Sequence, residues 1–248
     1  MSQENPSPLS GPGRGFTLEG RTVDAGRPVE WIKAGWQLFV KNPGVWIAEM
    51  VIGGIILVVL GMIPVLGQLA SNFLAVLFAA GLLLGCRSLA EGGELRVDHL
   101  FAGFKQNTGN LVMVGVYYLV GIVIIVGITF AIGGGSALSG ALLGRTAGIG
   151  LIAGGFLLAM LVGLALFTPL AMAVWFAPPL VVFRNVPPLE AMKASFNVCL
   201  KNMVPFLVYG VILLVLCVIA AIPLMLGFLV LGPVLIGAHY ASYMELFE

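Results

Sequence analysis

Few side chains in this sequence could do chemistry inside a membrane, and Glu49 is the first of them because it lies within a long apolar stretch. A charge in lipid is costly, so an acid there is by default a candidate for solute or proton passage. The alternatives are structural: Arg87 could neutralise Glu49, or the carboxylate could extend to the membrane surface. Tyr117 and Tyr209 each follow an earlier acid at the offset by which Glu49 follows Glu30. This spacing predicts three polar side chains at one depth.

A second candidate is His239, in the last apolar stretch and close to two tyrosines. A lone histidine among aromatic residues is more often hydrogen-bonded structure than a proton relay. A metal site would need further histidine, cysteine or carboxylate ligands at that depth, and the three cysteines are scattered. The sequence also lacks nucleophile-elbow and zinc-protease motifs. We therefore expect no metal, no other cofactor and no enzymatic activity.

Composition indicates the elements that carry these residues. The 248 residues are 60% hydrophobic and 9% charged, whereas a soluble domain has about 25% charged residues. Several apolar runs are long enough to cross a bilayer, and in lipid they must be helices. The net charge of +1 gives no reason to expect nucleic acid as a partner. The prediction is an all-α membrane protein with six transmembrane helices, at residues 45–62, 68–88, 111–132, 148–175, 204–222 and 224–244.

The basic residues predict the orientation of these spans. Eleven of the twelve Lys and Arg residues fall on one side of the predicted spans, and Arg145 falls on the other. The side rich in Lys and Arg is cytoplasmic. Both termini are therefore expected in the cytoplasm. Residues 1–27, rich in Pro, Gly and Ser, are predicted to be a disordered tail, and residues 28–248 a single transmembrane domain.

The segments on the cytoplasmic side resemble one another. An acid, a lysine, an amide and a second lysine recur at offsets 0, 3, 7 and 11, which places them on one face of a helix. The residues of this interfacial stripe are Glu30, Lys33, Gln37 and Lys41 in the first segment, and Glu190, Lys193, Asn197 and Lys201 in the third. In the middle segment the match is partial, with Asp98 in the place of the acid and Asn110 in the place of the asparagine that follows the second lysine.

This pattern predicts three repeated units, each with an amphipathic helix in the cytoplasmic interface followed by a hairpin of two spans. The units cover about residues 28–96, 97–188 and 189–248. Between the second hairpin's helices lies a glycine-rich stretch, around residues 133–149, with glycines at four-residue spacing. Such spacing favours close helix packing or a short re-entrant element over a ligand loop.

Two stretches resemble a known family. The run GRTVDAGR at residues 20–27, with Trp31, Trp36 and NPGVW at residues 42–46, resembles the start of a family of uncharacterised proteobacterial inner-membrane proteins. FAGFKQNTG at residues 101–109 resembles its second signature. The resemblance implies an integral inner-membrane protein of no established activity. More loosely, the region from residue 177 to 195 is similar to multi-pass membrane proteins implicated in envelope homeostasis and to the membrane domain of some phosphodiesterases.

These observations lead to a functional expectation. We expect a structural or accessory protein of the cell envelope, with the lipid bilayer and other membrane proteins as partners. The alternative is a transporter or channel for a small or lipid-like solute, with Glu49, Tyr117 and Tyr209 along its path. The sequence predicts neither the ligand nor the oligomeric state.

Overall fold

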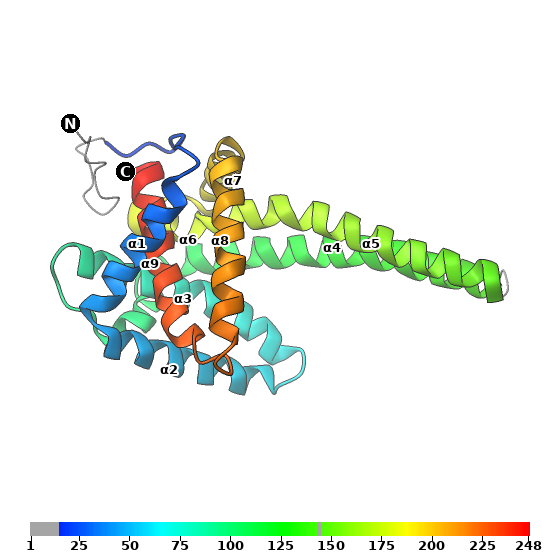
Figure 1. Ribbon diagram of the computed structural model, residues 1–248, viewed down its shortest axis with the longest axis horizontal. Helices are drawn as coiled ribbons and strands as arrows, with labels where there is room; N and C mark the ends of the chain where they lie inside the picture. The colour runs from blue at the N-terminus through cyan, green and yellow to red at the C-terminus, as the bar shows by residue number, and fades with distance from the viewer. Residues whose placement is uncertain (1–14, 143–144) are drawn as a thin grey trace.

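The computed structural model describes residues 15–142 and 145–248, and within them the regular structure is entirely helical (Figure 1). The elements are α1 (Arg27–Lys41), α2 (Pro43–Gly61), α3 (Leu66–Ala90), the 3-10 helix η1 (Val97–Phe104), α4 (Thr108–Leu142), α5 (Arg145–Trp175), α6 (Ala177–Arg184), α7 (Pro188–Lys201), α8 (Met203–Ala221) and α9 (Phe228–Phe247). The predicted all-α class is confirmed.

Five helical segments in the described residues are long and apolar enough to cross a membrane: Pro43–Gly61, Leu66–Ala90, Thr108–Leu142, Gly148–Arg184 and Met203–Ala221. They correspond to the first five predicted spans. The sixth prediction, residues 224–244, corresponds to α9, which is not among the five. Its first half is apolar, but its second half carries His239, Tyr240 and Glu245.

The long helices form three hairpins, α2 with α3, α4 with α5, and α8 with α9. In Figure 1, α4 and α5 run side by side as a pair that extends far from the other helices. The 35 residues of α4 give a helix about 52 Å long, well beyond a hydrocarbon core of about 30 Å.

The predicted end of this span at residue 132 is wrong, because the glycine-rich stretch continues α4 as helix to Leu142. Two of its glycines, Gly140 and Gly148, bring α4 and α5 into close contact. A Cβ atom added at Gly148 would overlap the carbonyl oxygen of Gly140 on the facing helix, so only glycine allows this approach. Of the two interpretations of the stretch, close helix packing is the one that the structure supports.

Three short helices pack against the hairpins. Helix α1 contacts α8 and α9, η1 contacts α2 and α3, and α7 contacts α4 and α5. Two of these short helices therefore pack on the hairpin that precedes them in the chain. Helix α1 has no preceding hairpin and packs on the last one, so the order of contacts is circular.

The segment before α1 is part of this packing. Thr17 donates its backbone N–H to the carbonyl of Phe247 (2.9 Å), and Arg21 donates its own to the carbonyl of Leu246 (2.8 Å). The sequence predicts a disordered tail over residues 1–27, but from Thr17 to Arg21 this segment is bonded to the end of α9. Residues 1–14 are outside the described residues.

Candidate functional site

Glu49 lies near the start of α2 and is completely buried. Its carboxyl group faces η1, close to the backbone of Leu100. One turn further along the same face, Gly53 is in contact distance of Leu100 and Phe78. Neither carboxyl oxygen has a hydrogen-bond partner among the described residues. Glu49 is thus an enclosed acid whose carboxyl oxygens have no partner in the described part of the chain, which is an energetically costly arrangement.

The predicted pair of Glu49 with Arg87 is wrong. Arg87 lies in the last turns of α3 and binds Glu91 instead, with Nε 2.8 Å from Oε1. Its guanidinium also lies over the ring of Phe183, 5.6 Å from the centroid. Glu91 is four residues away on the same helix, so it reaches Arg87 without the desolvation that a pair with the buried Glu49 would require.

The remaining members of the predicted polar cluster separate into two places. His239 stacks on Trp175 with ring centroids 5.2 Å apart, and Trp175 also contacts Tyr209 at 6.4 Å. Tyr209 is buried there and His239 is half-buried, and the buried Nε2 of His239 has no partner among the described residues. Tyr117 instead lies on α4 with 36% of its surface exposed, so it does not share the environment of Glu49 or Tyr209.

The structure changes the residue from which the middle segment is compared with the other two. The structure places Asn42, Asn107 and Asn202 immediately before the first helix of each hairpin, whereas the sequence comparison used Asn110. Counting seven residues from each of these asparagines leads to Glu49, Val114 and Tyr209, all of which are buried.

The three asparagines make related hydrogen bonds, each donated by the side-chain amide to a backbone carbonyl. Asn42 donates to Leu95 (3.4 Å), Asn107 to Val181 (3.0 Å) and Asn202 to Arg21 (2.9 Å). Leu95 precedes η1, Val181 precedes α7 and Arg21 precedes α1. Each asparagine therefore binds a segment that leads into a short helix. For Asn42 and Asn107 this helix comes later in the chain, and for Asn202 it is α1, at the start of the chain.

A small residue in each short helix makes a second set of related contacts. A Cβ atom at Gly35 of α1 would overlap the carbonyl oxygen of Val234 in α9, and one at Gly103 of η1 would overlap that of Leu77 in α3. In α7 the corresponding residue is Ser195, whose hydroxyl donates to the carbonyl of Met172 in α5 (2.6 Å). The same hydroxyl accepts the backbone N–H of Phe176 (2.8 Å), where α5 gives way to α6.

The thiol nearest this contact is Cys199, one turn further along α7, with Sγ 3.7 Å from the carbonyl of Met172. Burial raises the pKa of the Cys199 thiol to about 12. It is therefore protonated at neutral pH and is a poor nucleophile.

The predicted interfacial stripe is largely solvent-facing. Seven of its eight residues are exposed, and Glu30 is half-buried. The aromatic residues of α1 differ in burial: its buried side includes Trp31, Ala34 and Leu38, while Trp36 is exposed. This difference arises because α1 packs along α9 as well as presenting a surface outward.

Sequence reasoning missed a polar cluster at the end of α9. Arg27 forms an ion pair with Glu245, which also accepts the indole N–H of Trp31 (2.6 Å). Glu248 accepts Nε of Arg184 (2.7 Å) and the hydroxyl of Tyr243 (3.0 Å). The sequence did contain a signal for this cluster, because two acids lie in the last four residues of a chain that has few charges.

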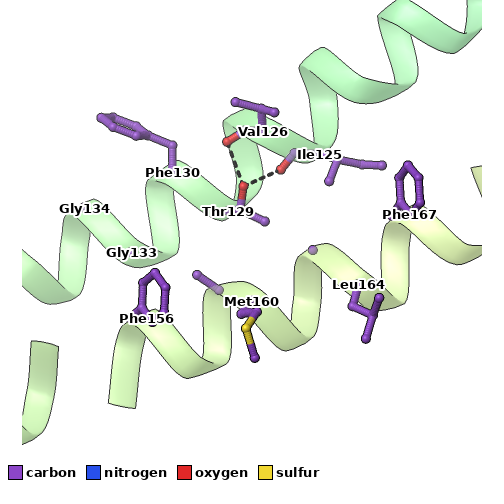
Figure 2. Close-up of a pocket in the computed structure, with 12 residues that line it drawn as sticks. Ile125, Val126, Thr129, Phe130, Gly133, Gly134, Phe156, Met160, Leu164 and Phe167 are labelled. Carbon is purple, nitrogen blue, oxygen red and sulfur yellow. Dashed lines mark hydrogen bonds between the residues drawn. The ribbon is translucent and has the colours of Figure 1, made fainter. Parts of the chain in front are cut away.

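The larger grooves on the molecule are apolar. One of about 690 Å³ lies between α4 and α5 (Figure 2). Its hydroxyl group, that of Thr129, is already bonded to the carbonyls of Ile125 and Val126. A second, of about 620 Å³, lies between α1, α8 and α9. Among the described residues no group of three or more metal-ligating side chains comes together.

Comparison with known proteins gives one relative at low identity. Over 189 residues, 73% of this chain and 70% of the other, the chain is 29% identical to the probable inner membrane protein BTH_II0599 of Burkholderia thailandensis. No family model and no solved structure matches the chain. The similarity confirms the resemblance to uncharacterised inner-membrane proteins, and with the five candidate spans it agrees with a multi-pass helical membrane protein.

Proposed function

We propose that this chain is an integral inner-membrane protein with a structural or accessory role in the cell envelope and without enzymatic activity. The single observation that carries this proposal is the enclosure of Glu49, which has no exposed surface. A solute or proton path would need water or a ligand to reach this carboxyl group, and Glu49 has no surface open to either. Contact with lipid and with other membrane proteins would be the basis of such a role.

We further propose that the chain is built from three like units closed into a ring. The chain repeats the order of a short helix followed by a hairpin three times. Support comes from the related bonds of Asn42, Asn107 and Asn202 and from the small residues at the centre of each short helix. Because α1 packs on the last hairpin, the first and third units meet as neighbouring units do elsewhere in the chain.

The proposed topology has six crossings, with α9 as the last, and cytoplasmic ends. The argument for α9 is one of parity. Residues 17–21 bind the backbone of Leu246 and Phe247, so the segment before α1 and the end of α9 lie on one side. The number of crossings between these two segments must therefore be even. The five candidate spans give an odd number, and a crossing by α9 makes it six. The excess of Lys and Arg supports the cytoplasm as that side.

Cysteine labelling tests the enclosure of Glu49 in the folded protein. In a background with the three native cysteines replaced by serine, Glu49→Cys is treated with a membrane-impermeant maleimide in spheroplasts and in inverted vesicles. We expect no labelling from either side, whereas the exposed Lys193→Cys should be labelled in inverted vesicles. The variant must elute from gel filtration at the same volume as the cysteine-free background, which shows that it is folded. Labelling of Glu49→Cys in such protein would favour the alternative, transport of a lipid-like solute. The apolar grooves also support that alternative.

A further inference from the structure

A small polar pocket lies where α3, α6 and α9 meet. Its volume is about 120 Å³, and two arginines, two glutamates and two tyrosines line it: Arg87, Arg184, Glu91, Glu248, Tyr240 and Tyr243. A single water needs only about 10–15 Å³, whereas pockets that hold a whole small molecule reach roughly 300–1,000 Å³. The space therefore suits one chemical group of a few heavy atoms.

The hydrogen-bonding capacity that remains in this pocket belongs mainly to donors. Arg87 bonds Glu91 through Nε (2.8 Å), and its two terminal nitrogens have no partner among the described residues. Arg184 bonds Glu248 through Nε and Nη2, which leaves its Nη1 without a partner in the same part of the chain. The carboxylate of Glu248, in contrast, already accepts a bond at each oxygen. A ligand here must supply acceptors, and the two guanidinium groups favour an anion.

Tyr240 adds a buried donor to this set. The residue is only 3% exposed, and its hydroxyl group lies close to Arg87, Glu91 and Glu248. Within the described residues this hydroxyl has no hydrogen-bond partner. A buried polar group without a partner costs free energy, so a ligand that bonds the hydroxyl removes this cost.

Both guanidinium groups are held in place before any ligand arrives. That of Arg87 lies over the ring of Phe183, 5.6 Å from the centroid, and that of Arg184 lies over the ring of Phe16 at 4.9 Å. A side chain that is already fixed loses less conformational freedom when a ligand binds. The planar fork of arginine also matches the oxygens of a phosphate group.

Glu91 is the group that an anion must compete with. Its side chain is 62% exposed and that of Arg87 is 49% exposed, and exposed pairs of this kind contribute little. The carboxylate of Glu91 can therefore turn toward solvent. Arg87 and Arg184 then face Glu248 as the one remaining acid of the lining, and the pocket has an excess of positive charge.

We propose that this pocket binds a terminal phosphate group, held by Arg87, by Nη1 of Arg184 and by the hydroxyl of Tyr240. A phosphate group presents its oxygens in a tetrahedron and can accept from all three residues, whereas a carboxylate presents two oxygens in a plane. The group can arrive on a soluble compound or on the headgroup of a lipid, because α3 and α9 end here on the side that the proposed topology makes cytoplasmic. Only this route of access rests on that topology.

Titration calorimetry of the full chain in a neutral detergent tests the site with inorganic phosphate as the probe. Phosphate should give saturable binding that sodium chloride of the same ionic strength does not. Arg87→Gln should weaken the affinity about tenfold, the usual effect of losing one charge-assisted contact. Arg96→Gln is the matched control and should bind as the native protein does, because Arg96 is also exposed and paired with an acid but lies outside the pocket.

Glu91→Gln makes the test independent of losses through misfolding. Removing the competing carboxylate should strengthen phosphate binding about threefold, which corresponds to the strength of an exposed ion pair. Unfolded protein cannot give such a gain. Unchanged or weaker binding in Glu91→Gln would overturn the proposal, as would an affinity that Arg87→Gln leaves intact or that Arg96→Gln lowers equally.

A second probe separates the two sources of the phosphate group. Short-chain phosphatidic acid carries a terminal phosphate, and phosphatidylcholine of the same chain length is its control because choline caps the phosphate. Phosphatidic acid that binds more tightly than inorganic phosphate, and less tightly in Arg87→Gln, identifies a lipid headgroup as the ligand. Equal affinities identify a soluble phosphate compound, and no saturable binding of either probe refutes the site. Because these titrations are made in detergent, an error in the proposed topology would not change their outcome.

Discussion

Asn202 shows how single buried side chains hold distant parts of this chain together. It is almost completely buried, accepts the backbone N–H of Val23 (2.9 Å) and donates to the carbonyls of Arg21 and Val198 (2.9 Å each). One amide thus satisfies backbone groups on both the amino-terminal segment and α7. Glu49 is the opposite case, since its buried carboxyl oxygens have no partner among the described residues.

Replacing Asn202 by alanine should destabilise the protein. The change leaves the N–H of Val23 and the carbonyl of Arg21 without this partner in a partly buried place, at a cost of about 1–3 kcal/mol. Thermal unfolding in detergent should show a lower midpoint, and protease should cut more readily between Gly15 and Arg27. Asn197→Ala, on the exposed side of the same helix, is the matched control and should change stability by less than about 0.5 kcal/mol. Equal effects of both changes would refute this role of Asn202.

Glu49→Gln should keep or raise the unfolding midpoint, because the amide has the size of the carboxyl group without a charge to bury. Glu49→Lys should lower the yield of folded protein strongly. Both are measured by gel filtration and thermal unfolding in the same detergent. A marked loss of stability in Glu49→Gln would show that the carboxylate has a partner essential to the fold.

The contacts of Glu248 predict a pH dependence. Burial acts to raise the pKa of Glu248, but hydrogen bonds from Arg184 and Tyr243 outweigh it and hold the pKa below its usual value. A lowered pKa in the folded state gives stability that is present above the ordinary glutamate pKa of about 4.3 and is lost as the pH falls through the folded value. The difference in unfolding midpoint between the native protein and Glu248→Gln should therefore be largest near neutral pH and shrink in acid. A difference that is constant with pH would contradict the ion pair.

At the scale of elements, the packing of α1 on α9 depends on Gly35. A Cβ atom there would overlap the carbonyl oxygen of Val234 and come within 2.7 Å of the backbone nitrogen of Ala238. Backbone atoms cannot move aside as a flexible side chain can. The two helices would have to separate, which would also disturb Trp31 and its bond to Glu245.

Gly35→Ala should therefore destabilise the protein by about 1–3 kcal/mol, the usual cost of overpacking, even though alanine is the better helix former. Gly44→Ala in α2 is the control, because nothing lies within 4 Å of an added Cβ, and it should be neutral or slightly stabilising. The comparison is made by thermal unfolding of both variants. If both variants unfold at the temperature of the native protein, the close approach of α1 and α9 is wrong.

Much of the element order could be predicted from the sequence, since long apolar runs in lipid can only be helices. The polar stripes of α1 and α7 were found because lysines mark their ends. The asparagine that directly precedes α4 was missed because Gln106, and not a lysine, precedes Asn107, and because η1 is a short 3-10 helix. The length of α4 was missed because glycine is a poor helix former in isolation. In the structure, contact with α5 stabilises the helical conformation of the glycine-rich stretch.

At the scale of the whole molecule, the site depends on contacts between the two ends of the chain. Arg27 and Trp31 bind Glu245, and Asn202 binds the carbonyl of Arg21. No periodicity within a single segment predicts such contacts. The pair of Glu49 with Arg87 was plausible from depth alone. It failed because depth does not determine which way a helix faces, and Glu49 faces η1.

The most direct test of the account is the side of the membrane on which each end of α9 lies. Leu224, in the turn before α9, is 89% exposed, and Glu19 lies in the segment bound to the other end of α9. In the cysteine-free background, the account predicts that a membrane-impermeant maleimide labels Leu224→Cys in intact spheroplasts. It predicts that the same reagent labels Glu19→Cys only in inverted vesicles. Labelling of both positions from the same side would contradict a sixth crossing and the ring that depends on it.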